Sequence, residues 1–163
     1  MARAYIMEQE YRNILDCGAG LCAEYYGFGD YDIEYSAIDS SRKFVKRGQK
    51  EGINITECDI NDIEFRDGKF DVCYCRHVLE HLEYYENALN EMIRVAKREV
   101  LVIFFLPPTM NDDRIVVIDN LNHNVYDRGK MIDFIYGNPK VESHFFEGMG
   151  NESLLHIILK DEA

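Results

Sequence analysis

The sequence has no tryptophan, only three prolines and few basic residues: 18 lysines and arginines stand against 30 aspartates and glutamates, for a net charge of −12 at pH 7. Because a chain with this much negative charge repels a phosphodiester backbone, we expect no nucleic-acid partner. No apolar run approaches the roughly 18 residues of a membrane helix, and residues 1–11 lack a signal-peptide core. The sequence therefore predicts a cytoplasmic protein with no membrane partner.

The five cysteines include no CxxC pair, and three fall in or beside apolar runs. This usage is typical of free, reduced, mostly buried thiols. With 163 residues, 47% of them hydrophobic, the chain is long enough for one core and short for two. We therefore predict a single domain over residues 1–163, with a short N-terminal extension.

Short apolar runs alternate with helical patterns along the whole chain, which predicts an α/β fold with a mostly parallel sheet. The expected strands are residues 11–16, 34–39, 53–58, 69–75, 100–106, 140–147 and 154–160, and the expected helices are 41–51, 84–97 and 127–136. The last two strands are joined by residues 148–151 alone, so they must form an antiparallel hairpin. The architecture predicted is a three-layer Rossmann-like sandwich with a seven-stranded sheet and a C-terminal hairpin.

The most informative motif is the apolar run that ends in Asp16-Cys17-Gly18-Ala19-Gly20. The two glycines let the backbone approach a ligand closely. A second apolar run stops at Asp39, whose carboxylate can accept hydrogen bonds from both hydroxyls of a ribose. The order strand, glycine turn, helix, strand and acid predicts an adenosine-containing cofactor.

Two cofactors fit this motif. Residues 18–23 satisfy the dinucleotide pattern G-x-G-x-x-G/A, which favours an NAD(P)-dependent oxidoreductase. However, Asp16 lies two residues before the first glycine, where its charge would oppose a pyrophosphate. The same acid would attract the ammonium and sulfonium groups of S-adenosylmethionine, which is the cofactor that we predict.

On these residues the chain resembles the class I S-adenosylmethionine-dependent methyltransferases of the small-molecule type, over about residues 11–160. The matching motifs are ILDCGAG at 14–20, AIDS at 37–40, ECDI at 57–60 and FDVCYCRHVLEHL at 70–82. The cofactor-binding residues that this resemblance implies are Asp16, Cys17, Gly18, Ala19, Gly20, Asp39, Ser40, Asp59, Ile60, Cys75 and Arg76. Asp16 and the glycines would lie at the methionine end, Asp39 at the ribose, and Asp59 with Ile60 at the adenine.

The resemblance also implies a transferase that methylates a small-molecule acceptor, whose identity stays open. Residues 107–127 follow the fifth expected strand and are predicted to form a substrate-facing insertion, with a small strand at 115–118. If the acceptor must lose a proton, His77 is the first candidate base and His123 the second. His77 and His81 belong to an H-x-x-E-H pattern, but an apolar strand runs directly into His77, so we predict no metal site and a structural His81.

Two departures from the family pattern leave alternatives open. Cys22 stands where a third glycine is common, and its sulfur would narrow the pocket or shift the following helix. Only about ten residues precede Tyr11, so the acceptor pocket is expected to be open or completed by a second copy in a homodimer. A module that binds S-adenosylmethionine without catalysis is therefore a third hypothesis.

Overall fold

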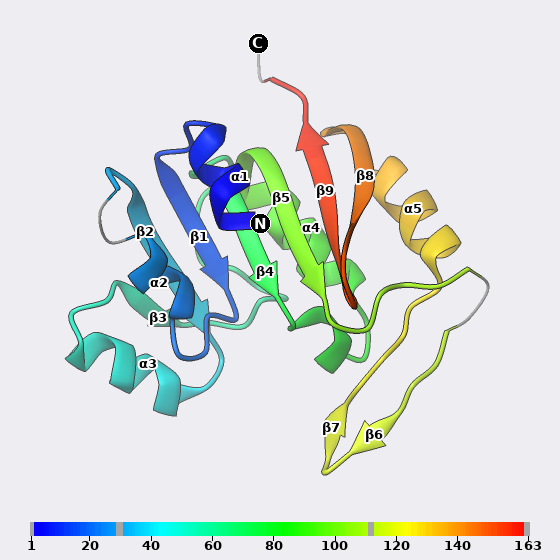
Figure 1. The fold of residues 1–163 in the computed structure, drawn as a ribbon, viewed down its shortest axis with the longest axis horizontal. Coiled ribbons are helices and arrows are strands. Elements are labelled where there is room, and N and C mark those ends of the chain that lie inside the picture. Colours follow the sequence, from blue (N-terminus) through cyan, green and yellow to red (C-terminus); the bar gives the residue numbers. More distant parts are fainter. Residues whose placement is uncertain (1, 29–30, 111–112, 162–163) are drawn as a thin grey trace.

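The computed structural model describes residues 2–28, 31–110 and 113–161, which are built around one seven-stranded sheet (Figure 1). The strand order is β3-β2-β1-β4-β5-β9-β8. The strands are β1 (Asn13–Cys17), β2 (Glu34–Asp39), β3 (Ile55–Glu57), β4 (Phe70–Arg76), β5 (Ala96–Phe104), β8 (Val141–Met149) and β9 (Glu152–Leu159). Neighbours from β3 to β5 pair in parallel, whereas β9 runs antiparallel to β5 and β8. The predicted sheet and its closing hairpin are confirmed.

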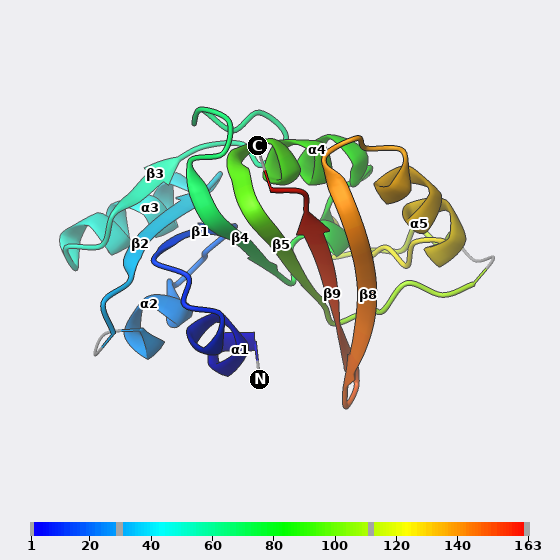
Figure 2. The same cartoon turned by 90° about the horizontal axis from the view of Figure 1, so that it is seen from above.

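Helices cover both faces of this sheet. They are α1 (Ala2–Glu8), α2 (Ala23–Gly27), α3 (Arg42–Lys50), α4 (Glu86–Val95) and α5 (Arg128–Tyr136), with a 3₁₀ turn, η1 (Leu79–His81). Viewed from above, α1 and α2 lie on one face, and α4 and α5 lie on the other (Figure 2). Two clusters of buried apolar side chains fill the space between the sheet and these layers. No helix within the described ranges is long and apolar enough to cross a membrane.

The helices that pack along the sheet follow the sequence periodicity. In α4, Ala88, Leu89, Met92 and Ile93 are buried at helical spacing. This helix ends at Val95, two residues before the predicted end, because Ala96 turns to extended backbone and pairs with Phe70 in the sheet. The helix expected after the glycine turn is α2, although its bounds are not predicted, and α1 is not predicted. Their five and seven residues are too short to show a clear periodic stripe.

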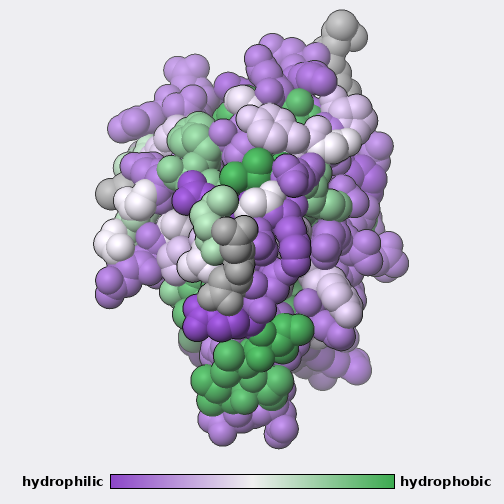
Figure 3. All heavy atoms as spheres, turned by 90° about the vertical axis from the view of Figure 1, so that its right-hand side faces the viewer, coloured by the Kyte–Doolittle hydropathy of each residue, from purple (hydrophilic) through white to green (hydrophobic). Residues whose placement is uncertain are grey.

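The predicted insertion forms a small hairpin of β6 (Val117–Ile118) and β7 (Leu121–Asn122), which projects beyond the edge where the parallel strands end (Figure 1). Residues 111–112 of this insertion lie outside the described residues. The two turn residues, 119 and 120, have φ of 52° and 64°, as a tight two-residue turn requires. Ile115 and Val117 are 63% and 62% exposed, and Figure 3 shows apolar side chains gathered on this projection.

A buried acid, Glu99, lies in the middle of the sheet on the face that α1 covers. It accepts hydrogen bonds from the Tyr11 hydroxyl at 2.5 Å, the Tyr5 hydroxyl at 3.1 Å and His156 Nδ1 at 2.7 Å. Burial beside this carboxylate raises the pKa of Tyr5 to about 12, so its hydroxyl remains a donor. These four side chains tie α1 and the following residues to β5 and β9.

Candidate functional site

A cavity of about 370 Å³ opens at the carboxyl ends of the parallel strands. In a sheet of this type, ligands bind at that edge, where loops leave the strands. The cavity is lined by Gly18, Gly20, Ile38, Asp39, Ser40, Ser41, Phe44, Cys58, Asp59, Ile60, His77, Val78, His81, Leu82 and Leu121. Six of these positions, Gly18, Gly20, Asp39, Ser40, Asp59 and Ile60, are predicted cofactor residues, and His77 is the predicted base. We call this space the edge cavity.

The glycine turn after β1 forms one wall of the edge cavity. Gly18 has a φ of 74°, and a Cβ at this position would lie 2.4 Å from Cγ2 of Val78. Gly20 has a φ of 53°, and a Cβ there would meet no atom within 4 Å. The amides of Gly18 and Ala19 donate to the Ile38 carbonyl at 2.8 and 3.1 Å. Gly18 thus allows close packing inside the protein, whereas Gly20 leaves room for a ligand.

Asp39 lies at the end of β2 and braces this turn. Its Oδ2 accepts the Gly20 amide and its Oδ1 accepts the Ser41 amide, both at 2.8 Å. Each carboxylate oxygen can accept a further hydrogen bond. Asp39 therefore fixes the glycine turn and still offers two acceptors to hydroxyl groups in the cavity.

The loops after β2 and β3 also contribute apolar side chains to the edge cavity. Phe44 of α3 and Ile60, which follows β3, both line it. The Asp59 carboxylate accepts the amide and the side-chain amide of Asn61 at 2.9 and 3.0 Å, which holds the loop after β3 in place. An aromatic side chain, an aliphatic side chain and a carboxylate suit a flat heterocycle with an exocyclic amine. Phe44 could not be predicted as a lining residue, because its position in a basic helix gives no signal in the sequence.

Asp16 is not among the residues that line the edge cavity. Its side chain is 4% exposed and accepts the Tyr35 hydroxyl at 2.5 Å on the face covered by α1 and α2. Burial raises the pKa of Asp16 to about 7, although the Tyr35 hydrogen bond acts in the opposite direction. The acid is therefore partly protonated near neutral pH, and its backbone lies two residues from the glycine turn.

Four other predicted cofactor residues also lie outside the lining. Cys17 and Cys75 are fully buried in the core, and Ala19 packs against the opposite core cluster. Arg76 extends from the end of β4 to Glu24 and Glu152, at 3.7 and 3.4 Å. All four lie in the strands and the turn that carry the lining residues, so what they bring to the site is backbone.

Cys22 does not narrow the edge cavity. Its side chain is 1% exposed and packs in the core cluster beneath α1 and α2. Its backbone has a φ of 54°, in the left-handed region that glycine adopts most easily. The structure thus gives a reason for a glycine at this position and shows that the thiol points away from the cavity. All five cysteines are free.

His77 follows β4 with a φ of 57°, a strained conformation for a residue with a Cβ. Its Nε2 lies 2.8 Å from Oε1 of Glu152, and its ring meets the Phe105 ring edge-on at 5.3 Å. Burial lowers the pKa of His77 despite the nearby Glu152 carboxylate. The imidazole is therefore neutral near pH 7 and can accept a proton.

His81 also lines the edge cavity, and its Nδ1 donates to the Asn122 carbonyl at 2.6 Å. This bond leaves Nε2 as the acceptor nitrogen in the neutral ring. His123, from the insertion, meets the His81 ring edge-on at 5.1 Å and the Phe105 ring at 5.9 Å. The structure thus brings both predicted bases, His77 and His123, around Phe105. It adds His81, for which only a structural role was predicted.

Glu80, between these histidines in the sequence, points into the protein. Its side chain is fully buried, and Oε1 accepts the Phe105 amide at 2.7 Å. His77 directly follows β4 and His81 lies in a 3₁₀ turn, so the H-x-x-E-H pattern does not lie on one α-helix. Glu80 instead joins the turn after β4 to the end of β5.

A doubly wound sheet with a glycine turn and an acid at the end of β2 defines a Rossmann-like domain that binds an adenosine-containing cofactor. A family model described as a methyltransferase domain matches residues 15–104. The chain belongs to this methyltransferase family. The resemblance predicted from the motifs is confirmed.

Two curated proteins resemble part of the chain. Ajmaline N-methyltransferase of Rauvolfia serpentina is 30% identical over 105 residues, covering 59% of this chain and 36% of that protein. An uncharacterised protein of Methanocaldococcus jannaschii is 36% identical over 86 residues, covering 53% of this chain and 36% of that protein. The chain therefore spans about a third of the length of these relatives.

Solved structures share the fold over nearly the whole chain. A protein of Pyrococcus horikoshii has a TM-score of 0.77 at 15% identity, covering 98% of this chain and 87% of that one. The 1,6-didemethyltoxoflavin-N1-methyltransferase of Burkholderia thailandensis, crystallised with S-adenosylhomocysteine, has a TM-score of 0.74 at 12% identity, covering 98% and 77%. At these identities the likeness concerns the fold.

Proposed function

We propose that this chain is an S-adenosylmethionine-dependent methyltransferase that acts on a small-molecule acceptor. The observation that carries the proposal is the edge cavity itself, in which Gly20 leaves open space and Asp39 offers two acceptors beside it. Membership of the methyltransferase family and the names of the relatives support this choice of cofactor over a nicotinamide dinucleotide.

The residues present fit this cofactor. The turn at Gly18 and Gly20 would hold the methionine end, Asp39 would accept the ribose hydroxyls, and Ile60 with Phe44 would enclose the adenine. Asp59 lies beside them for the exocyclic amine. When bound, S-adenosylmethionine supplies a methyl carbon that the sulfonium activates for in-line displacement.

The protein itself would position the reacting groups and accept a proton from the acceptor. The Asp16 side chain lies on the other face of β1, bonded to Tyr35, so it would support the glycine turn from behind and would not touch the cofactor. His77 is a neutral imidazole at the end of β4 and would accept the proton of an acceptor that must lose one. His123 is the second candidate for this role, and Phe105 orients both rings.

A thermal-shift experiment tests the cofactor. S-adenosylhomocysteine at about 100 times its dissociation constant should stabilise the chain by roughly 2.7 kcal/mol, which raises Tm by about 5 to 10 °C. The same concentration of NAD should give no shift. A shift with NAD and none with S-adenosylhomocysteine would overturn the proposal in favour of an oxidoreductase. If the chain binds S-adenosylmethionine but methylates none of a panel of amines, phenols and thiols, it is a binding module without catalysis.

We further propose that the chain forms a homodimer through the β6–β7 hairpin. Ile115, Val117 and Ile118 are 51% or more exposed on this projection, and Leu121 of the same hairpin lines the edge cavity. Apolar side chains gathered on one projection are typical of a protein contact. Light scattering should give twice the monomer mass, and Val117→Ser with Ile118→Ser should give the monomer mass. A monomeric wild-type chain would contradict this assignment.

A further inference from the structure

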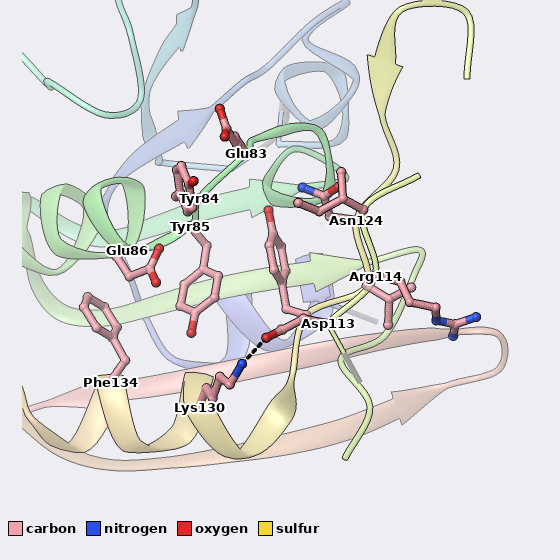
Figure 4. Close-up of a pocket in the computed structure, with 12 residues that line it drawn as sticks. Glu83, Tyr84, Tyr85, Glu86, Asp113, Arg114, Asn124, Lys130 and Phe134 are labelled. Atoms are coloured by element: carbon pink, nitrogen blue, oxygen red, sulfur yellow. Dashed lines mark hydrogen bonds and ion pairs between the residues drawn. The ribbon is translucent and has the colours of Figure 1, made fainter. Parts of the chain in front are cut away.

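A second cavity, of about 330 Å³, lies away from the edge cavity, between the start of α4, the start of α5 and the insertion (Figure 4). We call it the aromatic cavity. Its lining comes from residues 83–86, 113–115, 124–126, 130 and 134. These segments are distant in the sequence, and no motif of the methyltransferase family runs through the cavity. It goes beyond the proposed function, which makes no use of it.

Four aromatic residues line this cavity, Tyr84, Tyr85, Tyr126 and Phe134, and three of their rings are in contact. The Tyr85 ring meets the Tyr126 ring edge-on at 4.8 Å and the Phe134 ring edge-on at 5.8 Å. Tyr85 and Tyr126 are nearly buried, at 6% exposure each. Aromatic faces carry partial negative charge, so a cation that lies over an open face of one of these rings is attracted to it.

Carboxylates surround the same space. Glu83, Glu86 and Asp113 line it, and Asp113 is paired with Lys130 (Figure 4). Within the part of the chain that the structure describes, Glu86 forms no ion pair. The Arg114 side chain extends away from the aromatic rings in Figure 4. Three acidic and two basic side chains line the cavity, so it combines an aromatic wall with a small excess of negative charge.

A wall of polypeptide separates the aromatic cavity from the edge cavity. The Tyr126 hydroxyl donates to the carbonyls of Leu79 and Leu82, at 2.5 and 2.8 Å, and the Asn124 side chain also donates to the Leu82 carbonyl. Leu82 lines one cavity, and Tyr126 and Asn124 line the other. A ligand in the aromatic cavity is therefore screened from a group bound against the glycine turn.

We propose that the aromatic cavity is a second ligand site, which binds a small organic cation such as an alkylammonium or arylammonium compound. The aromatic wall holds the apolar part and attracts the charge, and Glu86 neutralises it. The site is distinct from that of methyl transfer and needs no bound cofactor.

Choline and its neutral isostere 3,3-dimethylbutan-1-ol provide the test. The quaternary nitrogen of choline has no lone pair and cannot be methylated, and the variants below distinguish binding in the aromatic cavity from binding in the edge cavity. Calorimetry on the full chain should give choline a dissociation constant of about 1 mM or below and the neutral alcohol one at least about tenfold higher. Equal affinity for the two compounds would overturn the proposal, and so would the absence of choline binding.

Matched variants locate the bound cation. Phe134→Leu, which keeps an apolar side chain, and Glu86→Gln should each weaken choline binding by about two- to fivefold. Glu142→Gln, an exposed acid on β8, should leave it unchanged. Asp39→Ala should weaken S-adenosylhomocysteine and leave choline binding intact. Choline binding that is lost in Asp39→Ala and kept in Phe134→Leu would place the cation in the edge cavity and refute the second site.

Discussion

The two cavities of this protein differ in what shapes them: backbone conformation in one and side chains in the other. The edge cavity owes its shape to backbone: two glycines with positive φ, and an aspartate whose oxygens hold the amides of Gly20 and Ser41. The aromatic cavity owes its shape to side chains from α4, α5 and the insertion, with the rings of Tyr85 and Phe134 in its wall. A backbone site leaves a short motif in the sequence, whereas a side-chain site assembled from distant segments leaves none.

The largest effect should come from Gly18→Ala. The new Cβ would lie 2.4 Å from Val78 at a φ of 74°, so the glycine turn must shift. We expect a loss of about 1 to 3 kcal/mol in the free energy of unfolding and a loss of about 100-fold in S-adenosylhomocysteine affinity. Urea denaturation and calorimetry measure the two effects.

Two controls separate the clash from the substitution itself. Val78→Ala removes the methyl groups that the new Cβ would meet, so the double variant should recover part of the lost stability. Gly148→Ala, where a Cβ meets no atom within 4 Å, should stay within about 0.5 kcal/mol of the wild type. If Gly18→Ala bound S-adenosylhomocysteine normally, the edge cavity would not depend on backbone geometry.

Asp39→Ala should have the next largest effect. It leaves the amides of Gly20 and Ser41 without their acceptor, and S-adenosylhomocysteine affinity should fall by about tenfold or more. Asp71→Ala is the matched control, because Asp71 also accepts two backbone amides, those of Arg12 and Asn13, at the opposite edge of the sheet. It should lower stability without changing the affinity. Equal affinity losses in both variants would mean that Asp39 acts only through folding.

Asp16, which lies next to the glycine turn of the edge cavity, should make the free energy of unfolding depend on pH. Its folded pKa of about 7 lies above the unfolded value of about 3.9, so the folded state binds the extra proton between these pH values. The stabilisation is therefore complete at low pH and is lost as the pH rises through about 7. As the pH rises through this window, the free energy of unfolding of the wild type should fall, relative to that of Asp16→Asn, by up to about 1.4 kcal/mol per pH unit. Parallel curves for the two proteins, measured by urea denaturation from about pH 5 to 8, would contradict the assignment.

The smallest effect should come from Tyr126→Phe, which removes a hydroxyl from the wall between the cavities. The carbonyls of Leu79 and Leu82 lose a donor, and the free energy of unfolding should fall by about 1 kcal/mol. Tyr136→Phe, on an exposed side chain of α5, should have no measurable effect. Stability equal to the wild type in Tyr126→Phe would show that the hydroxyl does not hold this wall.

The sequence predicts the sheet well because the spacing of apolar residues and the positions of glycines determine the local backbone conformation. Strand β2 is predicted to the residue, and helix α5 starts at its predicted cap, where Asp127 accepts the Lys130 amide at 3.0 Å. The short helix α1 is missed and α2 is expected only from the glycine turn, without bounds, because tertiary contacts and not periodicity hold them. Ile6 of α1, for example, is buried against the sheet by its place in the fold.

The candidate site is predictable in its backbone and much less so in its side chains. Gly18, Gly20 and Asp39 lie together as expected. Asp16 belongs to the same motif, but its side chain lies on the other face of β1, which a motif alone does not show. Phe44 and the aromatic cavity could not be found from the sequence, because their meaning depends on which distant segments the fold brings together.

The carboxylate of Glu99 also restricts how this sequence can change over evolutionary time. Replacing any one of its donors, Tyr5, Tyr11 or His156, leaves a buried charge with fewer partners and costs about 1 to 3 kcal/mol. Replacing all four residues by apolar side chains of similar volume can be nearly neutral. We therefore expect descendants of this chain either to retain the whole quartet or to have lost all of it, so that these four positions covary although they are far apart in the sequence.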